Sequence, residues 1–131
     1  MKNTEKVSLN LLVLDFNYYM FQHEFSIVKI EENRDTLELD DYYKIIGCER
    51  IDITDYNDDI AIIVDDEGLF KENTFYTEFV APDGCNFQLA GKLIFARNVY
   101  TENGTSLTGL TAGECFKLID SIKPRLMGVR A

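Results

Sequence analysis

The stretch from residue 42 to residue 68 constrains the fold more than any other, because it joins one helical pattern to two strand patterns. Gly47 follows an apolar helical face and suits the left-handed conformation that commonly ends a helix. Strand patterns follow at 49–54 and 60–64, and the polar residues 55–59 between them have turn chemistry. Loops of this length are common in hairpins. The stretch therefore predicts a helix, a sharp stop and two antiparallel strands.

The rest of the chain predicts further strands and one more helix. Residues 7–16 are apolar on both faces, which indicates an interior strand, and residues 17–20 are expected to be a connection. Thr111 and Glu114 have the spacing of a capping box, which begins a helix, and Pro124 limits that helix. The other strand patterns lie at 25–30, 73–81 and 92–97, with a weaker one at 87–89 and an exposed loop expected at 98–106.

Strands dominate and do not alternate regularly with the helices predicted at 36–46 and 111–122. This order indicates an α+β fold, with a mainly antiparallel sheet of about five to six strands and two helices packed on it. Residues 1–131 are expected to form a single domain, with 123–131 as a mobile basic tail. The side chains expected to pack inward are Ile51 and Ile53 from the first hairpin strand and Leu39, Tyr43, Ile46, Phe116, Ile119 and Ile122 from the helices.

Negative charge is concentrated in one segment of the chain. The formal net charge is −10, from 13 basic and 23 acidic residues. Residues 31–67 hold 14 of the acids and only three basic residues, a net charge of −11, so the remainder of the chain is nearly neutral. Such a segment repels nucleic acid, and direct nucleic-acid binding is not expected. It attracts cations or a basic protein surface.

Several other function classes have little support in the sequence. No apolar run approaches the roughly 20 residues of a membrane-spanning helix, and the polar amino terminus is a poor signal peptide, so we expect a cytoplasmic protein without membrane contact. Cys48, Cys85 and Cys115 are widely spaced and predict free thiols rather than a zinc site. Nucleotide-binding motifs are also missing, and no cofactor is expected.

Several short pieces between residues 37 and 97 resemble, in the same order, one uncharacterised protein family. The pieces are YKIIGC at 43–48, IDI at 51–53, VDDEGL at 64–69, Asn73 and AGKLIF at 90–95. They are similar to the "domain of unknown function 3846" family of phages, plasmids and integrated elements in bacteria. The resemblance implies an accessory protein of a phage or mobile element, and it brings no activity with it.

The acidic segment suggests a contact surface for another protein. Carboxylates placed regularly on one face can imitate duplex DNA, so the expected partner is a basic host protein, for example a nucleic-acid-binding protein that this chain would inhibit. We therefore expect a non-catalytic binding module rather than an enzyme. The residues expected to form the contact face are Asp40, Asp41, Asp58, Asp59, Asp65, Asp66 and Glu67.

Two alternatives stay open at this point. The same carboxylates, above all Asp65 and Asp66, are the oxygen ligands that Mg²⁺ and Ca²⁺ prefer, so a metal-dependent hydrolase or nuclease is the second hypothesis. The sequence after Asp55 is not an EF-hand, because Ile60 stands where glycine is needed. The third hypothesis is a small structural or self-assembling protein without a specific ligand, whose charge serves only solubility. The sequence indicates no oligomeric state.

Overall fold

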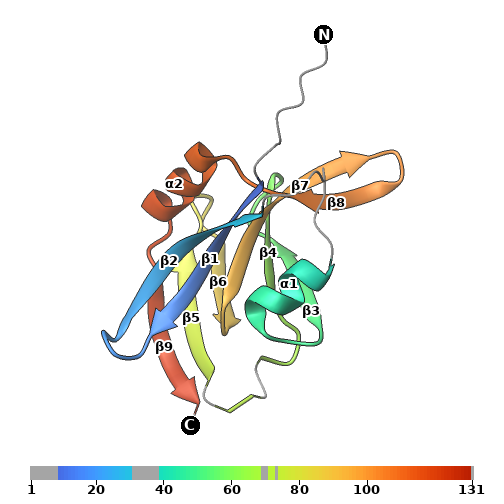
Figure 1. The fold of residues 1–131 in the computed structure, drawn as a ribbon. Helices are drawn as coiled ribbons and strands as arrows, with labels where there is room; N and C mark the ends of the chain where they lie inside the picture. The colour runs from blue at the N-terminus through green and yellow to red at the C-terminus, as the bar shows by residue number, and fades with distance from the viewer. Residues whose placement is uncertain (1–8, 31–38, 69–70, 73, 131) are drawn as a thin grey trace.

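The computed structural model describes residues 9–30, 39–68, 71–72 and 74–130 (Figure 1). Within them the chain has an α+β fold of antiparallel strands and two helices, which confirms the predicted fold class. The strands are β1 (Leu9–Asn17), β2 (Gln22–Ile30), β3 (Ile51–Asp55), β4 (Ile60–Asp65), β5 (Thr74–Val80), β6 (Asn86–Ala90), β7 (Leu93–Thr101), β8 (Gly104–Thr108) and β9 (Arg125–Arg130), and the helices are α1 (Leu39–Ile46) and α2 (Ala112–Ser121).

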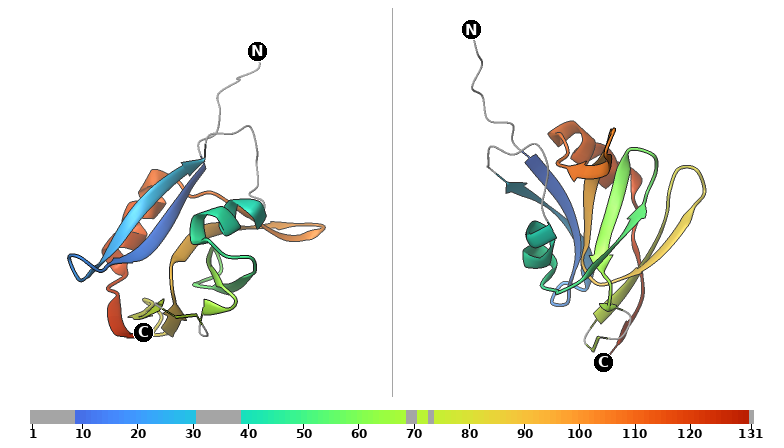
Figure 2. Two further views of the ribbon diagram at one scale, coloured as in Figure 1. Left: turned by 60° about the horizontal axis from the view of Figure 1, so that its bottom comes forward. Right: turned by 90° about the vertical axis from the view of Figure 1, so that its right-hand side faces the viewer.

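The strands form two sheets rather than one. Sheet A has six strands in the order β2-β1-β7-β4-β3, with β8 paired to β7, and sheet B has three in the order β6-β5-β9. Strand β1 lies between β2 and β7, so the interior position predicted for it is confirmed. In the right-hand view of Figure 2, α1 lies on one side of sheet A and sheet B on the other.

Each face of sheet A buries its own apolar cluster, because successive side chains of a strand point to opposite faces. Leu11 and Val13 of β1 pack on the α1 side, together with Ile63 of β4. Leu12 and Leu14 pack on the other side, against sheet B and α2. This arrangement explains why the central strands are apolar in unbroken runs.

Residues 42–68, the stretch that most constrains the fold, form the predicted end of a helix and the predicted hairpin. Gly47 has a φ of +79°, and its N–H donates to the Tyr43 carbonyl oxygen at 2.8 Å. Strands β3 and β4 pair from Ile51↔Asp65 to Asp55↔Ala61. Ile53, however, is 45% exposed, and the expectation that it faces the core is wrong. The reason is that β3 is an edge strand, and the cluster on the α1 side includes Ile51 but not Ile53.

Helix α1 buries a different tyrosine from the one expected. Tyr42 is 2% exposed, whereas Tyr43 is half-buried and Leu39 is exposed. Ile46 packs against the cluster as predicted. Two adjacent tyrosines satisfy the same helical spacing, and only the packing on sheet A decides between them. Residues 36–38, the predicted start of this helix, lie outside the described residues.

Helix α2 begins at the predicted capping box. The Glu114 N–H donates to Thr111 Oγ1 at 3.1 Å, and the Thr111 N–H donates to the Glu114 carboxylate at 2.8 Å. Phe116 is 63% exposed, so its predicted inward position is wrong. Its neighbour takes that place: the residues that pack inward are Cys115, Leu118, Ile119 and Ile122. In the described part of the chain, neither helix has the length and apolar character needed to cross a membrane.

Two segments expected to be irregular are strands. Residues 98–101 continue β7 and pair with β8, because the Asn103-Gly104 signal marks a hairpin turn between strand-forming residues rather than a loop. The expected mobile tail instead contains β9, which pairs with the edge of β5, and Arg125 forms an ion pair with Glu78 across that edge. Pairing of β9 removes the exposed hydrogen-bonding edge that β5 would otherwise present.

Candidate functional site

The seven acids predicted as one contact face occupy three separate places. Asp40 and Asp41 lie in the first turn of α1. The pair 58–59 lies in the turn before β4, and the group 65–67 lies at the other end of that strand. A six-residue strand rises about 3.3 Å per residue, so these two groups are about 20 Å apart. The structure brings Asp65, Asp66 and Glu67 together but does not join all seven in one face.

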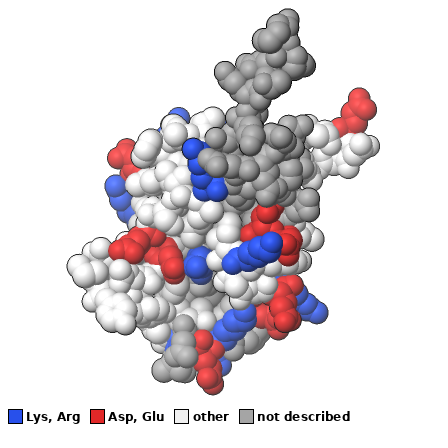
Figure 3. Space-filling model, viewed as in Figure 1, with Lys and Arg blue, Asp and Glu red and all other residues white. Residues whose placement is uncertain are grey.

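Basic side chains neutralise part of this charge. Asp40 pairs with Lys44 at 3.0 Å, one helical turn away. The carboxylate of Asp65 is only 9% exposed and pairs with Lys71, and this hydrogen-bonded pair raises the pKa of Lys71. Figure 3 shows basic atoms among the acidic atoms on the face that carries α1. The described acids therefore present less local charge than the sequence suggests, and Asp65 is not free to contact a partner.

The described residues provide no set of metal ligands for the hypothesis of a metal-dependent hydrolase or nuclease. Among them, no group of three or more His, Cys, Asp or Glu side chains is placed to hold a metal ion. The Lys71 ammonium already supplies the positive charge beside Asp65. The cysteines are free thiols, as predicted.

The turn between β1 and β2 carries a more unusual surface. Four consecutive large side chains are exposed there: Tyr18 by 49%, Tyr19 by 101%, Met20 by 65% and Phe21 by 66%. We refer to residues 18–21 as the aromatic tip. Single exposed apolar side chains are ordinary, but contiguous ones mark interaction sites. Tyrosine, phenylalanine and methionine are also enriched in protein interfaces.

Asn17 holds the aromatic tip in a fixed conformation. Its side-chain oxygen accepts hydrogen bonds from the N–H groups of Tyr19 at 2.9 Å and Met20 at 3.1 Å, and its amide donates to Glu24 at 3.1 Å. Phe21 follows with a φ of +52°, a conformation that is costly for a bulky residue. A surface that is fixed before binding loses less conformational entropy when a partner docks.

Two acids lie directly behind the aromatic tip. Asp15 and Glu24 are cross-strand neighbours, and like charges in that position destabilise a strand pair. Burial and, secondly, the charge of Asp15 raise the pKa of Tyr18. Lys92 approaches Asp15 only to 3.8 Å. Figure 3 shows an uncharged protrusion at this turn with acidic atoms beside it, so the site is an apolar tip with a negative border.

The described geometry can be compared with known proteins. A family model described as a domain of unknown function (DUF3846) matches residues 19–120. The chain belongs to this family. The DUF3846 match extends the resemblance seen at 37–97 in both directions, from within the aromatic tip to α2, and leaves β1 and β9 outside. Searches of curated proteins and of solved structures found no match.

In this DUF3846 chain, aromatic rings support the tip from below. Phe16 contacts Phe21 and His23 edge-on, with ring centroids 5.2 and 5.1 Å apart, and lies 5.7 Å from Phe75 of β5. His23 Nε2 is 2.9 Å from Oγ1 of Thr77, which is fully buried in β5. The tip hairpin is thus attached to sheet B by packing and by the hydrogen bond between His23 and Thr77.

The environment of His23 predicts a pH dependence of stability. Burial lowers the pKa of His23 below its ordinary 6.5, so the unfolded chain binds this proton more readily than the folded one. The free energy of unfolding should therefore have its full value above about pH 6.5. It should fall as the pH drops through the lowered pKa of the folded state. Urea unfolding between about pH 7.5 and pH 5.5 measures this slope. A His23→Gln variant should have the smaller slope, and equal slopes would contradict the prediction.

Proposed function

We propose that this protein is a non-catalytic binding module that inserts its aromatic tip into an apolar pocket of another protein. The observation that supports the proposal is the contiguous exposure of residues 18–21 on a turn that Asn17 already fixes. The exposed apolar side chains, the positive φ of Phe21 and the like-charge pair beneath the tip all cost folding free energy. Such departures from folding rules concentrate at functional sites.

The border of the tip indicates the chemistry of the partner. Asp15 and Glu24 favour an apolar pocket rimmed by lysine or arginine, because complementary charges guide association and exclude wrong partners. The same acids disfavour an anionic membrane surface. We therefore still propose a basic protein as the partner, as expected from the sequence, but we place the contact at the aromatic tip rather than in the acidic segment. A role as an accessory protein of a phage or mobile element is part of the proposal and rests on the family resemblance.

The remaining acids have a supporting role in this proposal. The groups in α1, in the β3–β4 turn and at the end of β4 add to a net charge of −10. Such a field accelerates the encounter with a basic protein without contributing contacts. Salt should therefore slow association more than it speeds dissociation.

The test uses a double variant, Tyr19→Ala with Met20→Ala. The immobilised full chain captures proteins from a lysate of the host, and the affinity of each captured protein is then measured with the purified pair. Hot-spot truncation costs at least about 2 kcal/mol, so the double variant should bind at least about 30-fold more weakly than the unaltered chain. Residues that pack beneath the tip stay in place, so the fold should be kept.

Two controls separate the tip from other surfaces. Phe116→Ala removes an aromatic side chain of α2 that is 63% exposed, close to the 65% of Met20, and should bind like the unaltered chain. A variant with Asp58, Asp59, Asp66 and Glu67 changed to their amides should lose association rate but keep most of the affinity. The proposal would be wrong if the tip variant bound with the affinity of the unaltered chain, or if only the amide variant lost affinity. Tip-dependent self-association in light scattering would favour a second copy of the chain instead.

A further inference from the structure

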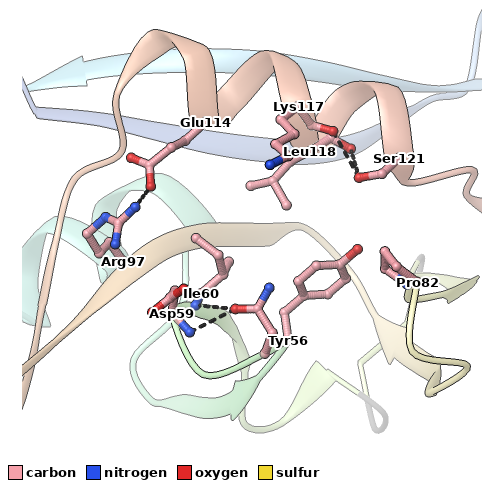
Figure 4. Close-up of a pocket in the computed structure, with 10 residues that line it drawn as sticks. Tyr56, Asp59, Ile60, Pro82, Arg97, Glu114, Lys117, Leu118 and Ser121 are labelled. Atoms are coloured by element: carbon pink, nitrogen blue, oxygen red, sulfur yellow. Dashed lines mark hydrogen bonds and ion pairs between the residues drawn. The ribbon is translucent and has the colours of Figure 1, made fainter.

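A second site lies at the end of the molecule opposite the aromatic tip. A half-open cavity of about 330 Å³ lies between α2, the β3–β4 turn and the β5–β6 turn. In Figure 4, Lys117, Leu118 and Ser121 of α2 lie on one side, with Tyr56 and Ile60 opposite them. This volume is at the lower end of the range of roughly 300–1,000 Å³ for small-molecule pockets. The cavity therefore suits a small ligand.

Tyr56 brings a buried hydroxyl without a partner to this cavity. The side chain is 4% exposed and stacks on Phe87 with ring centroids 5.7 Å apart. Its hydroxyl has no hydrogen-bond partner among the described residues. Burial raises the pKa of Tyr56, and the Ser121 hydroxyl beside it partly offsets this; Ser121 donates its own proton to the carbonyl oxygen of Lys117 at 2.9 Å, so it offers Tyr56 only an acceptor oxygen. Buried polar groups are nearly always paired, so this hydroxyl points to a missing partner.

Four charged side chains line the same cavity, and two of them form an ion pair with each other. Arg97 pairs with Glu114, which also caps α2. Asp59 and Lys117 are exposed at the rim of the cavity and make no ion pair within the described part of the chain. The cavity thus presents one free carboxylate, one free ammonium and one phenol. Its apolar walls are Ile60, Pro82 and Leu118.

We infer that this cavity binds a small zwitterion, a molecule with one ammonium and one carboxylate on an apolar body, of which free amino acids are the simplest class. The ligand's carboxylate accepts hydrogen bonds from Lys117 and from the Tyr56 hydroxyl, and its ammonium meets Asp59. A purely anionic ligand would place a like charge beside Asp59, and a purely cationic one would place a like charge beside Lys117. Charge-assisted hydrogen bonds at both ends therefore select for the doubly charged class.

The test titrates the isotopically labelled full chain with each standard amino acid and follows amide chemical shifts. At least one amino acid should cause saturable shifts at Tyr56, Lys117 and their neighbours. Its decarboxylated and deaminated analogues should bind at least about tenfold more weakly, because each loses one charge-assisted contact. Absence of saturable shifts with every amino acid, or equal binding by an analogue with one charge, would overturn the inference.

Matched variants locate the ligand and separate binding from folding. Tyr56→Phe and Lys117→Met should each weaken binding at least about tenfold. Lys123→Met, at a lysine outside the cavity, should change nothing. Tyr56→Phe removes an unpaired buried hydroxyl, so the melting temperature should stay or rise while binding is lost. Unchanged binding in both cavity variants would overturn the inference, and none of these outcomes depends on the aromatic tip.

Discussion

Phe79→Ala is expected to lower the free energy of unfolding by about 3 to 5 kcal/mol, the usual cost of truncating a buried aromatic side chain. Phe79 of β5 is 2% exposed and stacks on Phe87 with ring centroids 5.3 Å apart. It also lies 6.2 Å from Phe95 of β7 and 6.3 Å from Tyr56, so it joins sheet B to sheet A. Urea unfolding of the variant and the unaltered chain measures the loss.

The next residue of the same strand provides the control. Val80 is 56% exposed, and Val80→Ala should cost less than about 1 kcal/mol. Both variants shorten a side chain of β5, so strand propensity alone would give them similar effects. Equal losses would mean that the inner face of sheet B does not pack on sheet A.

Tyr42→Ala should cost about 3 kcal/mol or more, whereas Tyr43→Ala should cost about 1 kcal/mol. Tyr42 is 2% exposed and packs with Leu11, Ile63 and Ile94, and it is the main anchor of α1 on sheet A. The two variants delete the same atoms from neighbouring positions of one helix, which makes them a matched pair. Thermal unfolding compares them directly. A larger loss of stability in Tyr43→Ala would show that α1 packs on sheet A through the face that carries Tyr43.

Local patterns predicted those parts of the fold that depend on neighbouring residues. The capping box of α2 and the left-handed Gly47 are determined within one turn of the chain, and both appear as expected. The apolar residues on both faces of β1 predicted its interior place because only a strand covered on both sides buries them.

Features that depend on distant parts of the chain could not be read in this way. Helical spacing gave α1 two possible inner faces, and the choice of Tyr42 is made by sheet A. Strand β9 looked like a basic tail because its partner is the edge of β5, about 50 residues earlier. The exposure of Ile53 likewise follows from the edge position of β3, which no local pattern reveals.

The candidate site was missed for a related reason. The sequence counts acids but does not place them, and β4 carries Asp59 and Asp65 to opposite ends of one strand. Lys71, which neutralises Asp65, lies just beyond the acidic segment. Residues 17–20 were predicted to be a connection, but the exposure of residues 18–21 follows only once Phe16 fills the space against sheet B.

Amide hydrogen exchange of the full chain, with and without a captured partner protein, tests the central claim most directly. If the aromatic tip enters a pocket of the partner, exchange should slow at residues 17–22 and remain unchanged at the β3–β4 turn and at residues 65–67. Slowed exchange confined to those acidic positions, with the tip exchanging as in the free protein, would contradict the account.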